Sequence, residues 1–166
     1  MQIKHPGQRV ALLIDAQNLY HCAKNLYSSK VNFYEVLESA VADRILIRAF
    51  AYVIKTKTQE EKPFFEALEK LGIETRVKDL QEFKSGAKKA DWDVGIAVDA
   101  IRISPTVDTI ILASGDGDFL QMVEYLKNHG KRVEVIAFGK ATSAQLKEDA
   151  DEFIDMCKDT KKYLLK

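Results

Sequence analysis

Two aspartates one residue apart, Asp116 and Asp118, follow the short apolar run at residues 110–113. This run has the β-branched composition of a buried strand in a parallel sheet, and the residues after it have helical spacing. The acidic pair therefore falls in a turn between a strand and a helix, where open α/β sheets bind their ligands. Carboxylates directed at one point repel each other, and a bound cation relieves that repulsion. The spacing predicts a metal site.

Further aspartates are predicted at the same edge of the sheet. Asp15 ends the apolar run at residues 9–14, which is typical of a first strand. In the strand order 3-2-1-4-5 the first and fourth strands are neighbours, so Asp15 would meet the acidic pair. Asp93 begins a helix predicted over residues 92–103, and Asp99 lies about 120° further round it. We expect Asp93 to point into the cleft and Asp99 to flank it.

Oxygen ligands without histidine or cysteine favour Mg²⁺ or Mn²⁺ over zinc. Such an ion activates water and neutralises charge on a phosphodiester during in-line displacement. Taken singly, Asp15 is typical of a helix N-cap, Asp116 of a turn, Asp93 of a helix start and Asp99 of a solvated helix face. Those explanations do not account for aspartates from separate segments on one edge. The preferred interpretation is a metal site with the ligands Asp15, Asp93, Asp99, Asp116 and Asp118.

Two polar residues near these aspartates are candidates for binding substrate. Asn18, one turn into the first predicted helix, could position water or a phosphate, and is as readily an exposed helix residue. Ser114 could donate to a phosphate or to an aspartate, or simply satisfy the turn.

The elements that must hold these residues alternate along the chain. Strands are predicted at residues 9–14, 44–54, 73–80, 110–113, 132–138 and 153–156. Helices are predicted at residues 18–27, 32–41, 58–71, 92–103, 119–129 and 143–150, with Thr58 and Glu61 as a capping box and a polar loop at 81–89. This alternation predicts an α/β three-layer sandwich around a mainly parallel, doubly wound sheet.

Length and composition bound the protein class. The 166 residues suffice for a single domain, 1–166, with a core at about 9–154 and a C-terminal helix or tail at 155–166. The 25 basic and 25 acidic residues balance, which argues against coating nucleic acid by bulk charge. Cys22 and Cys157 form neither a metal-binding pair nor a redox motif. With a polar N-terminus and no bilayer-length apolar run, the chain is expected to be cytoplasmic.

The chain resembles the NYN domains of the LabA-like group, within the PIN-like nuclease superfamily. The resemblance covers about residues 9–154 and is carried by an ordered set of segments rather than by one motif. Those segments are Ala11–Asp15 with Asn18, Asp93–Asp99, Ser114–Phe119, and Val133–Phe138 followed by Ser143 and Leu146. Gln17 departs from the pattern, since many relatives carry glutamate there.

This resemblance implies a PIN-like fold and a Mg²⁺- or Mn²⁺-dependent ribonuclease activity. It implies catalytic roles for Asp15, Asp93, Asp116 and Asp118, with Asn18 and Asp99 as further matches. The implied partner is RNA, single-stranded in preference to duplex, with no membrane; a homodimer is left open.

In the mechanism that this resemblance implies, a metal ion held by the aspartates activates water, and side chains around the cleft hold the RNA strand. Asn18, Ser114, Lys88 and Lys89 are the candidates for contacting substrate, although a lysine-bearing loop is more often only solvent-exposed. Trp92 could stack on a base, although a single aromatic on a helix usually belongs to the core.

Two other functions compete with the nuclease. The first is a non-catalytic nucleic-acid-binding or regulatory module that keeps the PIN-like fold, but clustered negative charge gains such a module nothing beside a polyanion. The second is a metal-dependent phosphohydrolase of another α/β family. Its Asp-x-Asp motif at the end of the first strand is absent, because Ala16 and Gln17 follow Asp15.

Overall fold

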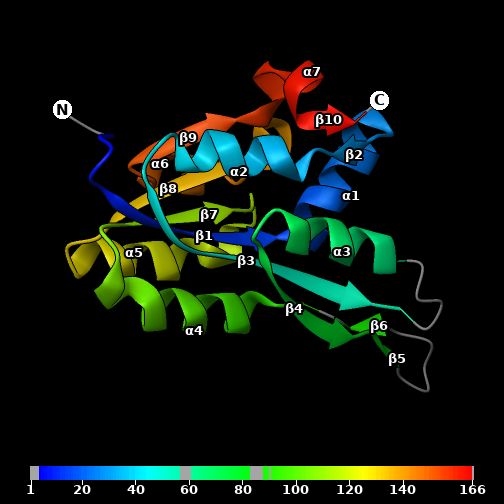
Figure 1. Ribbon diagram of the computed structural model, residues 1–166, viewed down its shortest axis with the longest axis horizontal. Helices are drawn as coiled ribbons and strands as arrows, with labels where there is room; N and C mark the ends of the chain where they lie inside the picture. Colours follow the sequence, from blue (N-terminus) through cyan, green and yellow to red (C-terminus); the bar gives the residue numbers. More distant parts are fainter. Residues whose placement is uncertain (1–3, 57–60, 83–87, 90, 166) are drawn as a thin grey trace.

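The computed structural model describes residues 4–56, 61–82, 88–89 and 91–165, with the backbone alone at 81–82 and 88–89. Its middle layer is a sheet of six parallel strands in the order β4-β3-β1-β7-β8-β9 (Figure 1). The strands are β1 (Arg9–Asp15), β3 (Ile45–Lys55), β4 (Glu74–Asp79), β7 (Thr109–Ala113), β8 (Arg132–Ala137) and β9 (Glu152–Asp155). The predicted doubly wound sheet is confirmed, including the reversal of order at β1.

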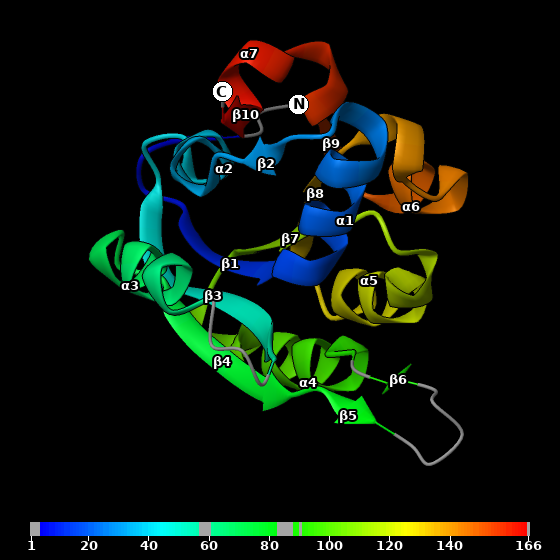
Figure 2. The same ribbon diagram turned by 90° about the vertical axis from the view of Figure 1, so that its right-hand side faces the viewer.

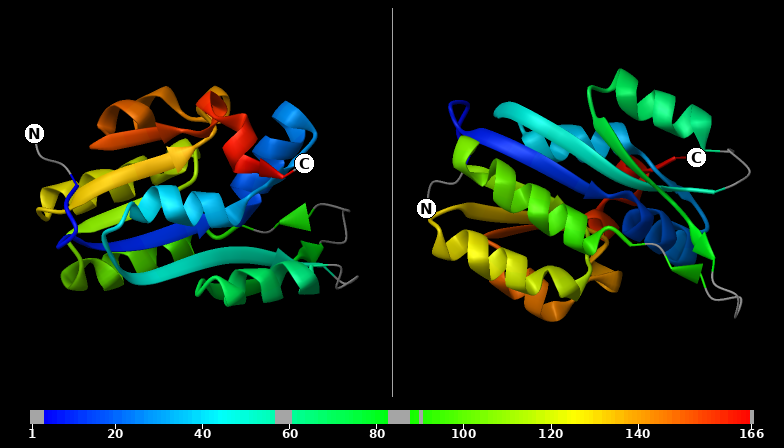
Figure 3. Two further views of the ribbon diagram at one scale, coloured as in Figure 1. Left: turned by 45° about the horizontal axis from the view of Figure 1, so that its top comes forward. Right: turned by 90° about the horizontal axis from the view of Figure 1, so that it is seen from below.

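Helices cover both faces of this sheet. On one face lie α1 (Ala16–Tyr27), α2 (Phe33–Val41) and α3 (Lys62–Lys70), and on the other lie α4 (Asp93–Ile103), α5 (Leu120–Asn128) and α6 (Ala144–Asp149) (Figures 1 and 3). Among the described residues, none of these helices combines the length and apolarity that a bilayer span requires. Thr58, expected to cap α3, lies outside the described residues, and Glu61 precedes the helix without a side-chain cap.

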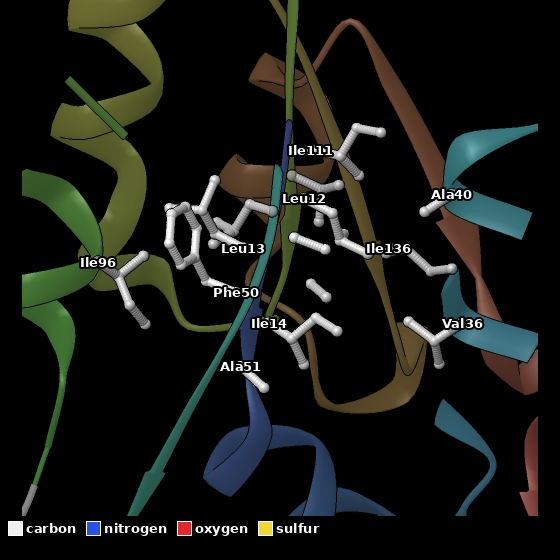
Figure 4. Packing of buried hydrophobic residues seen from close by; sticks show 14 of the residues in the cluster. Leu12, Leu13, Ile14, Val36, Ala40, Phe50, Ala51, Ile96, Ile111 and Ile136 are labelled. Atoms are coloured by element: carbon white, nitrogen blue, oxygen red, sulfur yellow. The ribbon is translucent and has the colours of Figure 1, made fainter. Parts of the chain in front are cut away.

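The two central strands explain the apolar runs of the sequence. Every residue of β7 is buried, and so is β1 from Val10 onward, because helices shield these strands on both sides. Successive side chains of β1 alternate between the two layers. Leu13 packs toward Ile96 of α4, whereas Leu12 and Ile14 face the side of Val36 on α2 (Figure 4).

Three parts of the chain differ from the expectations. The polar loop expected at residues 81–89 contains a small antiparallel hairpin, β5 (Gln81–Glu82) with β6 (Lys88–Lys89). The helix expected from Asn18 begins directly after Asp15. The C-terminal segment forms α7 (Thr160–Tyr163) and β10 (Leu164–Leu165), which pairs with β2 (Lys30–Val31). Two-residue strands carry too little periodicity to be recognised in a sequence.

A buried ion pair joins α2 to the far half of the sheet. The guanidinium of Arg44 donates to both carboxylate oxygens of Glu134 on β8, at 2.9 and 2.8 Å, and both side chains are inaccessible to solvent. Arg44 also donates to the Ala40 and Val41 carbonyls that end α2, and Arg132 provides a second partner for Glu134. The pair therefore satisfies helix-end carbonyls and a buried carboxylate at once.

Replacing Arg44 should test this pair. Arg44→Met leaves the Glu134 carboxylate buried with Arg132 alone, so we expect a loss of about 3 kcal/mol in the free energy of unfolding. Arg48→Met, which breaks the exposed pair between Arg48 and Glu74, should cost less than about 1 kcal/mol. Urea denaturation of the two variants measures the difference, and equal losses would contradict a structural role for the buried pair.

Candidate metal centre

The carboxyl ends of β1 and β7 meet because these strands are parallel neighbours, with Ile14 beside Ala113. Asp15 then begins α1 as its N-cap, accepting from the Asn18 backbone N–H at 3.2 Å. Its other carboxylate oxygen accepts from the Ser114 hydroxyl at 3.1 Å. The Asn18 side-chain oxygen in turn accepts from the Gly115 N–H at 3.1 Å. Two side-chain bonds therefore tie the end of β1 to the turn after β7.

That turn presents the acidic pair found in the sequence. Asp116 caps the short 3-10 helix Gly117–Phe119 (η2), its carboxylate accepting from the Asp118 N–H at 2.9 Å. Gly115 is needed here for lack of space: a Cβ would lie 3.0 Å from the Ala141 carbonyl oxygen and 2.5 Å from the Thr142 hydroxyl. Ala141 and Thr142 therefore pack closely against Gly115, which helps to fix the turn that carries Asp116 and Asp118.

Asp93 comes to the same site from a different segment of the chain. It begins α4, in the first turn, where the helix dipole favours a negative charge. One carboxylate oxygen from each of Asp93, Asp116 and Asp118 lies within 4.8 Å of the others. We call these three residues the acidic centre. The prediction that Asp93 points inward agrees with this geometry.

The electrostatics of the acidic centre are unfavourable without a counter-ion. Burial, and then the charges of Asp116 and Asp15, raise the pKa of Asp93 to about 6. Burial also raises the pKa of Asp15, although hydrogen bonds from Asn18 and Ser114 oppose that effect. A divalent cation would remove both the repulsion and the desolvation cost of the charged form. A donor set of carboxylate oxygens alone fits Mg²⁺ or Mn²⁺.

Asp15 and Asp91 flank this centre. Both oxygens of Asp15 accept hydrogen bonds, and its charge contributes to the raised pKa of Asp93. Asp91 lies two residues before α4 and is not among the ligands predicted from the sequence. Its charge also raises the pKa of Asp93, and its carboxylate accepts from the Asp93 N–H at 3.2 Å. The Asp-x-Asp spacing of residues 91 and 93, like that of 116 and 118, was the signal available in the sequence.

Asp99 is not brought to the other aspartates. It lies on the side of α4 that faces β3 and β4, where its carboxylate accepts from the Tyr52 hydroxyl at 2.8 Å. Arg76 and Arg102 form ion pairs with it at 2.9 and 3.3 Å. Neither a place beside the acidic centre nor a solvated helix face describes this residue, which is 8% exposed.

The residues predicted to contact substrate lie in different parts of the structure. Asn18 and Ser114 lie at the β1–β7 junction, where the hydrogen bonds above occupy their side-chain oxygens. Lys88 and Lys89 form β6, and their side chains lie outside the described part of the structure. Trp92 donates its indole N–H to the Val53 carbonyl at 3.0 Å and packs against Tyr52, with ring centroids 5.3 Å apart.

Fold and site together define a PIN-like α/β domain with an acidic centre at the carboxyl edge of its sheet. Residues 9–157 match the NYN domain, and the chain belongs to this family, part of the PIN-like nuclease superfamily. Within the family it is LabA-like: it is 27% identical over 158 residues to "Low amplitude and bright protein LabA" of Synechococcus elongatus, covering 89% of this chain and 83% of that protein.

Two further comparisons agree. The chain is 30% identical over 157 residues to the uncharacterised protein MJ0482 of Methanocaldococcus jannaschii, covering 91% of this chain and 57% of that protein. The crystal structure of VPA0982, a protein of unknown function from Vibrio parahaemolyticus, superposes with a TM-score of 0.87 at 34% identity. That match covers 99% of this chain and all of the other, so the fold is shared throughout.

Metal binding should stabilise the protein in a pH-dependent way. The pKa of Asp93 is higher in the folded protein than in the unfolded chain, so the protonated Asp93 carboxyl stabilises the fold at low pH. This contribution is fully present below the unfolded-state pKa of Asp93 and is lost as the pH rises through about 6. A cation offsets that loss, so Mn²⁺ should raise the Tm more at about pH 7 than at about pH 5. At tenfold excess over its Kd the expected stabilisation is about 1.4 kcal/mol, or roughly 3–6 °C.

Differential scanning fluorimetry with and without Mn²⁺ measures this shift. Asp93→Asn should lose it, whereas Asp43→Asn, an exposed aspartate before β3, should keep it. An equal shift in the wild type and in Asp93→Asn would show that the ion binds elsewhere.

Proposed function

We propose that this protein is a metal-dependent ribonuclease that hydrolyses phosphodiester bonds of single-stranded RNA at the acidic centre. The observation that carries the proposal is the convergence of Asp93, Asp116 and Asp118, from two separate segments, within a domain of a nuclease superfamily. A module that only bound RNA would gain nothing from such a concentration of negative charge, because the ligand is a polyanion.

Asp93, Asp116 and Asp118 would hold Mg²⁺ or Mn²⁺, with Asp15 beside them. When bound, such an ion lowers the pKa of water and neutralises charge on the scissile phosphate. Asp118 is the exposed member of the three, so the strand would approach from its side. Asp93 and Asp116 are partly buried, which limits the motion of their carboxylates.

The chain's other residues keep this arrangement rigid. The Asp15–Ser114 and Asn18–Gly115 hydrogen bonds fix the β7 turn, which carries Asp116 and Asp118, relative to β1 and α1. Such preorganisation spares the site a rearrangement when substrate binds. We propose a supporting rather than a substrate-binding role for Asn18 and Ser114, since their oxygens are engaged within the protein.

The strand itself needs cations to hold it. Lys88 and Lys89 form β6 of the β5–β6 hairpin, which lies beside the start of α4 (Figure 2), and Asp93 follows Lys89 by four residues. We propose that they contact backbone phosphates there. Such contacts position a strand without reading its sequence. The preference for RNA over DNA is supported by family membership.

Cleavage assays on labelled single-stranded RNA and DNA, with Mn²⁺ or with EDTA, test the proposal. We expect Mn²⁺-dependent cleavage of RNA by the wild type, and at least about a hundredfold lower rate for Asp93→Asn and Asp118→Asn, because each removes a ligand charge.

Asp43→Asn is the matched control, and its rate should equal that of the wild type. Tight RNA binding without cleavage under any of these conditions would refute the nuclease and favour the non-catalytic binding module.

A further inference from the structure

We infer that the groove between β4 and α4 is a second nucleic-acid contact site, in which Arg76 and Arg102 bind a backbone phosphate of the strand that reaches the acidic centre. The identity of that strand rests on the proposed function. The site itself rests on the arginines and on the groove that they line.

The groove has a volume of about 410 Å³. It is lined by Arg76 and Val77 of β4, by Trp92 just before α4, and by Val98, Asp99 and Arg102 of α4. Because β4 is an edge strand of the sheet, this groove lies at the side of the molecule, as Figure 2 shows for the two elements. A ligand can therefore enter without movement of the core.

Asp99 gives the two arginines a defined position. Its buried carboxylate pairs with Arg76 from the strand and Arg102 from the helix, and the Tyr52 hydroxyl supplies a third contact. Phe50 adds a further constraint on Arg76, whose guanidinium lies 4.9 Å from the ring centroid. Side chains held in this way lose less entropy on binding than unrestrained surface arginines.

The charge balance of this group favours an anion. Two guanidinium groups face one carboxylate, which leaves a net positive charge. Each guanidinium has five N–H donors, so its pairing with Asp99 leaves donors for a ligand. The Arg76 side chain is 38% exposed and that of Arg102 is 70% exposed, so both remain accessible from the groove. Planar guanidinium groups match the geometry of a phosphate.

The cations continue from the groove toward the acidic centre. Lys78, two residues after Arg76 on β4, donates to the Asp91 carbonyl at 3.0 Å, next to the start of α4. Arg102 lies nine residues after Asp93, about 13.5 Å along the helix axis and about 180° around it. A strand in the groove would therefore have to pass around the start of α4, beside Lys78 and Asp91, to reach Asp93. This direction favours a polyanionic strand over an acidic peptide, although exposed Val77 and Val98 would also suit a peptide.

Trp92 does not offer a stacking face along this path. Lys78 lies 4.4 Å from the centroid of its ring. A Cβ at Gly95 would lie 2.6 Å from that ring, so the indole packs directly on the α4 backbone. The groove would then contact phosphates rather than bases, and we expect binding with little sequence preference.

The test measures RNA binding separately from cleavage. A short fluorescein-labelled single-stranded RNA is titrated, with Mg²⁺ present, into the full chain carrying Asp93→Asn. Adding Arg102→Ala should weaken binding about three- to tenfold and reduce the salt-dependence slope by about one. Adding Lys161→Ala, which removes an exposed cation from α7, should change neither. Arg102→Lys should restore the slope, because it restores the charge.

The outcomes separate this inference from the proposed function. If Arg102→Ala binds RNA as the Lys161→Ala control does, or if no variant binds RNA, the groove inference fails even where the wild type cleaves RNA. If the wild type does not cleave but Arg102→Ala still weakens binding, the inference stands and only the nuclease proposal fails. A polyglutamate peptide that competes as well as RNA of equal charge would overturn the assignment to phosphate.

Discussion

The parallel pairing of β1 with β7 is the constraint on which the rest of the structure depends. It places two strand ends side by side at the point where the strand order reverses, and the acidic centre is built at that junction. Hydrogen bonds from Ser114 to Asp15 and from Gly115 to Asn18 secure it. Backbone pairing alone would align the strands, but these bonds also set the turn from which Asp116 and Asp118 project.

Helix α4 carries two aspartates, Asp93 and Asp99, in electrostatic environments of opposite sign. Its first residue, Asp93, faces other carboxylates, and its charged form is disfavoured there without a cation. Less than two turns later, Asp99 is buried between arginines that satisfy it. The two carboxylates thus have different roles for a simple reason. One lacks a basic partner among the contacts described above, and the other has two.

Much of the architecture was predictable because the signals are local. Fully buried strands such as β7 appear as unbroken apolar runs, and the helix predicted from residue 32 begins at its Asn32 cap, whose side chain accepts from the Glu35 N–H. The pairing of β2 with β10 was not predictable, since it joins residues more than 130 positions apart through two-residue strands. The Arg44–Glu134 pair was hidden for a similar reason: neither residue type is expected in a core unless its partner is known.

For the site, the sequence by itself determined the edge of the sheet on which the aspartates gather, because residues that follow parallel strands must emerge on one side. The tertiary structure alone decided which of them meet. Asp93 and Asp99 share one helix, and the sequence favoured Asp93 as the inward residue, but it could not identify Tyr52 and Arg76 as the neighbours of Asp99. Only the packing of α4 between η2 and the β4 edge turns Asp93 toward the acidic centre and Asp99 toward Arg76. That choice depends on contacts between distant segments, which no local pattern records.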